Sequence, residues 1–279
     1  MPELPEVETV RRDLVSLVGG KKISEVLVRD RRVLEGFGVG GGPRRQVRVT
    51  DFVQRVVGRT VRDVLRRGKY LIFDLGPDRA LLAHLRMTGR LVVGPPDVGA
   101  RAVFRFEGAK DVLNFSDTRR FGELWLAEEW QKDASIAALG PDPLNDLLDV
   151  EAWGKDLRRS GAKMQAALLD QKRMAGLGNI YVTEALFLSG IRPTRRARTV
   201  KAVKIFPLVE NIRRVLKEGL AHRGVSFRDY RDARGERGQA RERLLVYGKA
   251  GSPCPLCQTK FRGVKVSGRG TVYCPKCQK

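Results

Sequence analysis

The sequence ends in two CxxC pairs, Cys254-Pro-Leu-Cys257 and Cys274-Pro-Lys-Cys277, with sixteen residues between them. These four are the only cysteines among the 279 residues. Two such pairs can present four thiolates to one tetrahedral zinc ion, and the valines between them alternate as in two strands joined at residues 268–270. The pattern predicts a β-hairpin zinc ribbon with one structural Zn²⁺. Two disulfides or four free thiols are the alternative.

The charge of the chain is strongly positive and unevenly distributed. Lys and Arg total 54 against 32 Asp and Glu, a formal net charge of +22. From Ile191 onward there are 23 basic and 6 acidic residues, so most of the excess lies in the part that carries the cysteines. A basic region with a metal-bound hairpin is typical of nucleic-acid binding. A solvated basic surface without function is the alternative.

The length of the chain suggests two domains, each with its own core. No apolar run approaches the roughly 20 residues that span a bilayer, so no membrane partner is expected. The start of the sequence lacks a basic and then apolar leader, and reduced zinc-bound cysteines suit the cytoplasm. We expect a cytoplasmic monomer.

The first half of the chain predicts one helix and then strands. Val7, Val10, Leu14 and Leu17 share one face of a helix that Gly19-Gly20 ends. Short apolar stretches separated by turns then predict a β-sandwich or barrel. The predicted strands are Ile23–Val28, Val53–Leu65, Tyr70–Leu75, Ala80–Leu85, Leu91–Val93, Ala102–Phe106, Val112–Phe115 and Gly122–Leu126. Residues 36–45 are Gly-rich and lack the Lys-Ser/Thr ending of a phosphate-binding loop, which indicates a flexible connection.

The second half predicts helices. Two prolines within residues 139–144 indicate a linker, and helices are expected at 161–171, 178–189 and 203–220. Residues 223–243 are polar and weakly patterned, and we expect them to be mobile. The predicted fold class is α+β with two domains. The predicted boundaries are 1–135 for an N-terminal β-sandwich catalytic domain with an N-terminal helix, 136–150 for the linker, 151–243 for a helical domain and 244–279 for the ribbon.

Four motifs carry a family resemblance in addition to the ribbon. They are MPELPEVETVRRDL at the start, HLRMTGRL at 84–91, DTRRFG at 117–122 and LDQKRMAGLGNIYVTEALFLSGIRP at 169–193. In this order they closely resemble the formamidopyrimidine-DNA glycosylase family, bifunctional bacterial repair enzymes for oxidised purines. The sister endonuclease VIII-like branch opens Pro-Glu-Gly-Pro, so Leu4 indicates the purine branch. The resemblance implies a helix–two-turn–helix motif in the helical domain.

Pro2 is the predicted nucleophile. Removal of Met1 would expose its imino nitrogen, and an α-amino group titrates near 8, against about 10.4 for lysine. The terminal amine is therefore unprotonated near neutral pH far more often than a lysine. A secondary amine that attacks a sugar C1′ gives a covalent iminium intermediate. The alternative is that Pro2 is merely tolerated at the terminus.

Three charged residues complete the predicted catalytic group. Glu3 can move protons, and the resemblance implies that it assists opening of the deoxyribose ring and the later elimination. Glu6 resembles a second active-site acid, although a carboxylate at a helix N-terminus is favourable in itself. Lys69 matches the family lysine that contacts phosphate beside the lesion, with a solvated lysine as the alternative.

A glycosylase must take the damaged nucleotide out of the helix and fill the gap. Met87, Arg119 and Phe121 match the intercalating residues of the family: an apolar wedge, a guanidinium for the orphaned cytosine and an aromatic ring between base pairs. His84 and Arg120 match phosphate contacts. A core histidine is the alternative for His84.

Further DNA contacts are implied in the second half. In Gly176-Leu177-Gly178-Asn179 the glycines let a helix N-terminus approach DNA, and exposed amides with the Asn179 side chain hold a phosphate. Arg269, at the tip of the ribbon hairpin, matches an arginine that holds phosphate near the lesion. Gln165 departs from the family, because many relatives have lysine there, and a phosphate or base contact would be lost.

These observations together predict a base-excision-repair DNA glycosylase and AP lyase that acts on duplex DNA in the bacterial cytoplasm. The resemblance implies removal of 8-oxoguanine and formamidopyrimidines, followed by β,δ-elimination. The alternatives are an endonuclease VIII-like glycosylase for oxidised pyrimidines and a catalytically silent DNA-binding zinc protein.

Overall fold

The computed structural model describes residues 1–34 and 47–279, so the Gly-rich connection predicted at 36–45 lies outside the described residues. The chain forms two compact units. The first unit contains Met1–Ala138 together with His222–Arg241, and the second contains Leu139–Ala221 together with Glu242–Lys279. The predicted domain boundaries stay predictions, although the contacts assign residues 222–241 to the first unit rather than to the helical part.

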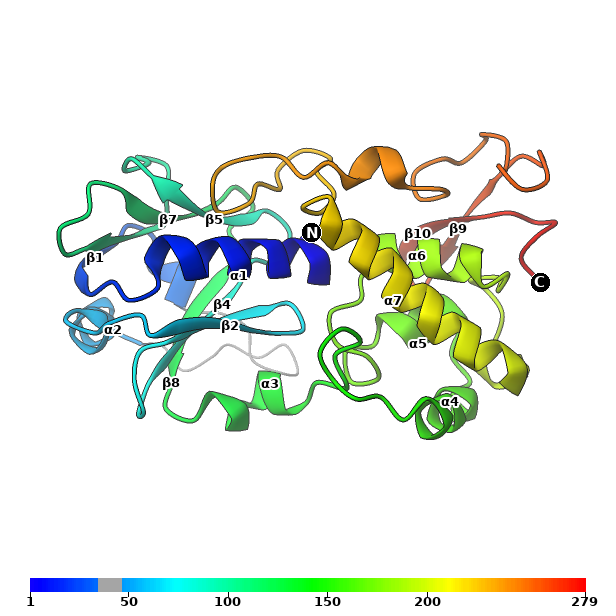
Figure 1. Ribbon diagram of the computed structural model, residues 1–279, viewed down its shortest axis with the longest axis horizontal. Helices are drawn as coiled ribbons and strands as arrows, with labels where there is room; N and C mark the ends of the chain where they lie inside the picture. The colour runs from blue at the N-terminus through cyan, green and yellow to red at the C-terminus, as the bar shows by residue number, and fades with distance from the viewer. Residues whose placement is uncertain (35–46) are drawn as a thin grey trace. The chain divides into compact units, whose positions relative to one another are not determined.

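Helix α1 (Leu4–Val18) opens the first unit. Its apolar residues recur every three or four positions, and Val7, Val10, Leu14 and Val18 are all fully buried. Pro5 suits the first turn, where its missing N–H is not needed. The helix packs on strands β2 and β3, as Figure 1 shows for α1 (blue) and β2. The predicted first helix is confirmed.

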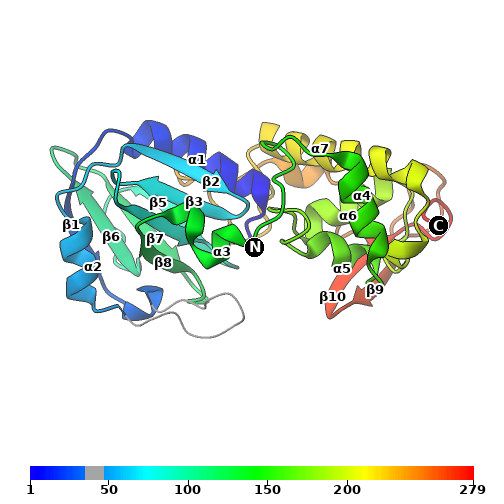
Figure 2. The same ribbon diagram turned by 90° about the horizontal axis from the view of Figure 1, so that it is seen from below.

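The first unit contains two four-stranded antiparallel sheets. One sheet has the order β1-β6-β7-β5, and its strands are β1 (Ile23–Val28), β5 (Gly89–Gly94), β6 (Ala102–Phe106) and β7 (Val112–Asp117). The other has the order β2-β3-β4-β8, and its strands are β2 (Asp63–Arg67), β3 (Tyr70–Asp74), β4 (Ala80–His84) and β8 (Glu123–Ala127). One hydrophobic core takes side chains from both sheets and from α1, among them Phe73, Phe104 and Phe115. Figure 2 shows the strands of both sheets next to α1. The predicted β-sandwich is confirmed.

The strand predicted at Val53–Leu65 is wrong. Its first part belongs to helix α2 (Val49–Val56), and β2 begins only at Asp63. Phe52 and Val56, four residues apart, are buried on one face of α2. The valines of this stretch favour strands, but tertiary burial selects the helical period. The shorter elements of the unit are η1 (Arg31–Leu34), η2 (Trp130–Lys132) and α3 (Ala134–Ala137).

The second unit is helical with a terminal hairpin. Its helices are α4 (Val150–Arg159), α5 (Met164–Leu169), α6 (Asn179–Leu188) and α7 (Ile205–Ala221). The last three confirm the predicted helices, whereas α4 was not predicted. Asp149 accepts a hydrogen bond from the Ala152 N–H and caps α4. An aspartate in front of a helical stretch is a local signal for the start of this helix. The hairpin pairs β9 (Arg262–Val266) with β10 (Arg269–Tyr273), and η3 (Ala197–Thr199), η4 (Ala202–Lys204) and η5 (Ala240–Arg243) are short 3₁₀ turns.

Residues 223–243 were predicted to be mobile, but the segment 222–241 packs against α1. Tyr230 and Ala233 enter the core of the first unit. Arg223 forms ion pairs with Asp13 of α1 and with the buried Asp232. Arg223 and Arg234 of this segment thus form ion pairs, although the polar composition of the segment suggests solvated side chains. Among the described residues no helix is long and apolar enough to cross a membrane.

Candidate functional site

The predicted nucleophile lies at the start of α1. Pro2 is buried, Glu3 is 3% exposed, and Met1 in front of them is exposed. Glu3 is the N-cap of α1 and forms a capping box with Glu6, in which each side chain accepts a hydrogen bond from the other residue's backbone N–H. The Glu3 N–H donates to Glu6 Oε2 at 2.8 Å. The capping box therefore holds the backbone and side chain of Glu3, the residue that directly follows Pro2, in one orientation.

Glu6 joins this segment to residues 222–241. Its second oxygen, Oε1, accepts the Val225 N–H at 2.8 Å, and its backbone oxygen accepts the Tyr230 hydroxyl at 3.2 Å. Burial and the nearby Glu6 charge raise the pKa of Tyr230 well above 10, so the phenol remains a donor. The acid role of Glu6 stays a prediction. Its contact with Val225 was not predicted from the sequence, because the two residues lie 219 positions apart.

Lys69 is buried in the tight turn between β2 and β3. Arg66 holds that turn, since its Nη1 donates to Gly68 O at 2.9 Å and its Nε donates to Glu8 Oε2 at 2.9 Å. Burial alone would raise the pKa of Glu8, but hydrogen bonds from Arg11, Arg12 and Arg66 lower it to about 2. The turn that carries Lys69 is thus tied to α1 through an ionised carboxylate.

The structure brings the predicted intercalating residues onto two connected turns. Thr88, beside Met87, donates its hydroxyl to Asp117 and accepts the Arg119 N–H at 3.0 Å. Met87 and Phe121 are 41% and 46% exposed, and the Arg119 guanidinium lies 5.1 Å from the Phe121 ring centre. Exposed apolar side chains on braced turns suit insertion between bases.

Asp117 is the residue that braces these turns. It is buried, and its Oδ2 accepts the Gly122 N–H at 2.6 Å while Arg101 lies 3.6 Å away. Arg120 adopts a left-handed backbone conformation (φ 60°) and is exposed next to it. Asp117 is the first residue of the DTRRFG motif, but the motif alone does not predict this bracing contact. An aspartate directly before a polar turn was the available signal.

His84 is buried, as the core alternative anticipated. Its Nδ1 accepts the Arg86 N–H at 3.0 Å, and its ring contacts Tyr70 edge to face at 4.6 Å between centroids. With Nδ1 as acceptor, the proton of the neutral ring is assigned to Nε2. The phosphate role of His84 stays a prediction that would use this Nε2–H.

In the second unit the structure brings together Asn179 and the ribbon hairpin. Asn179 is the first residue of α6, and its Nδ2 donates to Gly270 O at 2.7 Å. Arg269, next to Gly270, is exposed at the start of β10. The two residues predicted to hold phosphate in this unit therefore belong to one connected group.

The four cysteines form a cluster that fits a zinc ion. Their sulfurs lie within 4.8 Å of one another, with 4.0 Å between Cys254 and Cys277 and 3.4 Å between Cys257 and Cys274. A tetrahedral ion with Zn–S bonds of about 2.3 Å requires sulfurs roughly 3.8 Å apart. Four thiolates this close would repel one another strongly unless a cation lay among them. The predicted structural zinc is confirmed.

Glu184 is a further residue that sequence reasoning missed. It is 3% exposed on α6, and its carboxylate accepts the N–H groups of Leu245, Val246 and Tyr247 at 2.7, 2.9 and 2.7 Å. These three amides belong to the segment that leads to the first CxxC pair. A glutamate within the apolar helix stretch TEALFL was the only signal in the sequence.

Comparisons with known proteins agree along the whole chain. Residues 1–124 match the formamidopyrimidine-DNA glycosylase N-terminal domain, 139–230 its H2TH domain, and 251–279 the zinc finger found in FPG and IleRS. The formamidopyrimidine-DNA glycosylase of Desulfitobacterium hafniense is 40% identical over 284 residues, covering 100% of both chains.

Solved structures agree as well. The Lactococcus lactis Fpg in complex with DNA containing an abasic site has a TM-score of 0.88 at 34% identity, covering 99% of each chain. MutM in complex with DNA containing carbocyclic 8-oxo-G has a TM-score of 0.87 at 33% identity, covering 100% of each. The chain therefore belongs to the formamidopyrimidine-DNA glycosylase family, the zinc-containing DNA glycosylases and AP lyases of base-excision repair.

Proposed function

We propose that this protein excises oxidised purines from duplex DNA with Pro2 as the nucleophile. The observation that carries the proposal is the fixed direction of the Pro2–Glu3 segment, which Glu6 holds through the Glu3 amide. After loss of Met1, the imino nitrogen of Pro2 attacks C1′ of the damaged nucleotide, and the C1′–N9 bond breaks with transfer of a proton to the base. Opening of the deoxyribose ring gives the iminium ion.

Glu3 is the proposed proton carrier of these steps. Its carboxylate assists ring opening and then removes a proton from C2′, after which the 3′-phosphate leaves. A second elimination expels the 5′-phosphate, and hydrolysis of the imine regenerates Pro2. Elimination at both sides leaves a one-nucleotide gap.

Substrate choice follows from the same assignment. We expect 8-oxoguanine opposite cytosine and the formamidopyrimidines as substrates. The solved complexes of relatives with DNA that contains an abasic site or carbocyclic 8-oxo-G support this expectation. The curated relatives are bacterial, and we place the activity in the bacterial cytoplasm, beside the genomic DNA.

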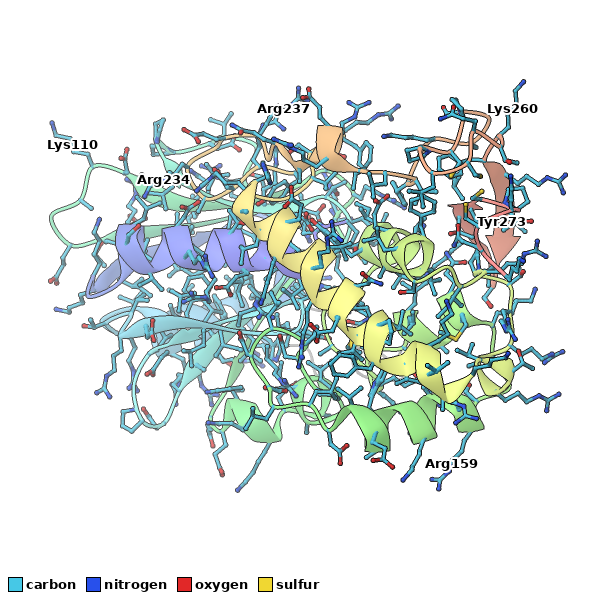
Figure 3. The ribbon with its side chains drawn as sticks, turned by 45° about the vertical axis from the view of Figure 1, so that its right-hand side comes forward. Lys110, Arg159, Arg234, Arg237, Lys260 and Tyr273 are labelled. Atoms are coloured by element: carbon cyan, nitrogen blue, oxygen red, sulfur yellow. The ribbon has the colours of Figure 1, made fainter. Side chains whose placement is uncertain are left out.

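DNA backbone binding would use the basic surface of each unit. Figure 3 shows Lys110 in the first unit and Arg159 and Lys260 in the second pointing into solvent. Phosphate neutralisation of this kind supplies affinity without sequence information. Zinc is structural in this proposal, because four cysteines leave no coordination position for water.

Borohydride trapping tests the nucleophile directly. Reduction of the iminium should crosslink the protein to 8-oxoguanine duplex, and peptide mass spectrometry should locate the adduct on a proline-terminated peptide without Met1. Pro2→Gly should lose most base excision, and Glu3→Gln should lower it by about 10²-fold or more while retaining DNA affinity.

Four outcomes contradict parts of the proposal. An adduct on a lysine, or an active protein that fully retains Met1, would refute Pro2. Wild-type excision by Glu3→Gln would assign proton transfer to another acid. Preference for thymine glycol over 8-oxoguanine in a lesion panel would favour the oxidised-pyrimidine alternative.

A further inference from the structure

Gln165 is a buried polar residue that the proposed chemistry does not use. It lies on α5 with no exposed surface, and its Nε2 donates to Asn179 Oδ1. Its Oε1 has no hydrogen-bond partner in residues 1–34 and 47–279. A buried side-chain amide whose oxygen has no hydrogen-bond partner lowers the stability of the fold. The hydrogen bond that its NH₂ group does make to Asn179 is therefore the contact that can account for a glutamine at this position.

That bond sets the orientation of the Asn179 amide. An asparagine side chain has one oxygen that accepts and one NH₂ group that donates, on opposite sides. Because Gln165 donates to Oδ1, the NH₂ of Asn179 faces Gly270 O, at 2.7 Å. Rotation of the amide by 180° would bring two oxygens together at Gly270, and Gln165 disfavours that orientation.

Two neighbouring contacts join the hairpin to α6: an inner, buried one between Thr183 and Thr271, and an outer, exposed one between Asn179 and Gly270. At the inner one, the hydroxyls of Thr183 and Thr271 lie 3.0 Å apart and are buried. At the outer one, Asn179 holds Gly270, and both Gly270 and Arg269 are exposed. The Asn179 bond thus holds the residue that directly follows Arg269 in the chain.

We propose that Gln165 is a positioning residue for the DNA-backbone contacts of this unit. It acts through Asn179, which holds Gly270 and so directs Arg269 toward phosphate. The inference rests on the proposed phosphate role of Arg269. The glutamine that departs from the family pattern does not simply lose a contact; its buried amide orders the residues that touch DNA.

A double-mutant cycle tests the coupling. The affinity of the zinc-loaded protein for a duplex with a tetrahydrofuran abasic analogue is measured by fluorescence anisotropy at several salt concentrations. Arg269→Ala alone should weaken binding by about tenfold and reduce the salt slope by about one. In a Gln165→Met background, Arg269→Ala should weaken binding by less than about threefold, because the guanidinium is no longer directed. Equal losses in both backgrounds would overturn the proposal.

Thr183→Val provides the matched control. It removes the inner attachment and leaves Gln165 and Asn179 unchanged, so Arg269→Ala should still cost about tenfold in that background. Loss of coupling in Thr183→Val as well would mean that general loosening of the hairpin is measured, and would contradict a specific role. Zinc content is determined for each variant. If Gln165→Met loses zinc, Gln165→Glu, which has the same shape but cannot donate to Asn179 Oδ1, replaces it.

A readout without DNA separates this inference from the proposed function. Hydrogen exchange of the ¹⁵N-labelled Asn179 side-chain amide should be slow in the wild type and faster in the Gln165 variant. Unchanged exchange would overturn the positioning role whatever the DNA data show. A slow wild-type amide that speeds up in the variant, combined with no effect of Arg269→Ala on affinity, would instead refute the phosphate role of Arg269 alone.

Discussion

The amino-terminal segment and the zinc ribbon are each held by one buried glutamate, but only the first has a large apolar core behind it. Glu6 accepts backbone N–H groups of Glu3 and Val225, and Glu184 accepts three at residues 245–247. The core of the first unit extends through α1 and both sheets. The core at the ribbon consists mainly of Phe187, Val246, Phe261 and the cysteines themselves.

The difference indicates where each region is vulnerable. Within the β-sandwich, loss of one polar contact leaves most of the buried apolar area intact. In the ribbon, the metal ligands are also the core residues, so a single ligand affects both binding and packing. We expect the chemical step to withstand substitutions better than DNA binding does, and the following experiments can break or sharpen this contrast.

The largest effect should come from the metal. Cys254→Ser should release the zinc and unfold the hairpin, because three thiolates do not complete the tetrahedral shell. DNA affinity should fall by more than about 100-fold, while Pro2 stays reactive toward a small aldehyde in borohydride trapping. Zinc content and anisotropy are measured together.

The control for this experiment lies between the two ligands of the first pair. Leu256 is 68% exposed, so Leu256→Ser changes the same turn without touching a sulfur and should keep one zinc per chain. A metal-free Cys254→Ser protein that binds lesion duplex normally would remove the ribbon from the binding site.

Glu184→Gln should give the next largest effect. The amide replaces an oxygen with an NH₂ group, which then faces backbone N–H groups that it cannot satisfy. The loss should be about 2–4 kcal/mol in the free energy of unfolding of the second unit. Urea denaturation of the zinc-loaded protein measures it, with Glu210→Gln on the exposed side of α7 as the matched control. Equal stabilities of the two variants would show that the three hydrogen bonds contribute little.

Gly224→Ala probes the corresponding contact of the first unit. A Cβ at Gly224 would lie 2.7 Å from Cγ of Glu6, and the backbone has φ +83°. Gly235 has nearly the same φ, +85°, but its nearest atom would lie 3.6 Å away. Gly235→Ala should therefore cost about 1 kcal/mol from backbone strain alone, and Gly224→Ala about 3 kcal/mol with displacement of Glu6.

The rate of base excision is then compared between Gly224→Ala and Gly235→Ala. Excision should fall more in Gly224→Ala than in Gly235→Ala, because Glu6 also holds the Glu3 amide. If the two variants have the same stability and the same activity, Glu6 does not position the nucleophile segment.

The smallest effect concerns pH. The pKa of Glu8 is about 2 in the folded chain against 4.5 as its ordinary value, so the ionised carboxylate stabilises the fold. This contribution is complete above about pH 4.5 and is lost as the pH falls toward 2. The difference in urea midpoint between wild type and Glu8→Gln should be largest at pH 6 and should shrink progressively at pH 4 and 3. A constant difference would assign the effect to packing rather than to charge.

The sequence predicted the elements whose signals are local. The CxxC spacing, the helical period of α1 and the alternation of most strands each lie within some twenty residues, and they predicted the zinc site and the sandwich. The stretch Val53–Leu65 was misassigned, since its valines suit a strand while the burial of Phe52 and Val56 requires a helix.

The site was predictable where the motifs were continuous, and not where distant residues meet. No local pattern joins Glu6 to Val225 or Asn179 to Gly270, because each pair depends on packing between segments far apart in the chain. The same holds for residues 223–243, whose polar composition predicted mobility. The carboxylates that order them come from α1: Glu6 accepts the Val225 N–H, and Asp13 pairs with Arg223.

The composite first unit has a consequence for how the protein is made. The ribosome has synthesised the whole sandwich once it reaches Ala138. The residues that cover Glu6 and Asp13 begin at His222, more than 80 residues later. At about 5–20 residues per second, the ribosome needs roughly 4 to 17 s to synthesise that interval. The nascent chain thus exposes the buried acids of its first helix for seconds. A fragment that ends at Ala138 lacks the residues that cover these acids, so we expect it not to reproduce the native packing of α1.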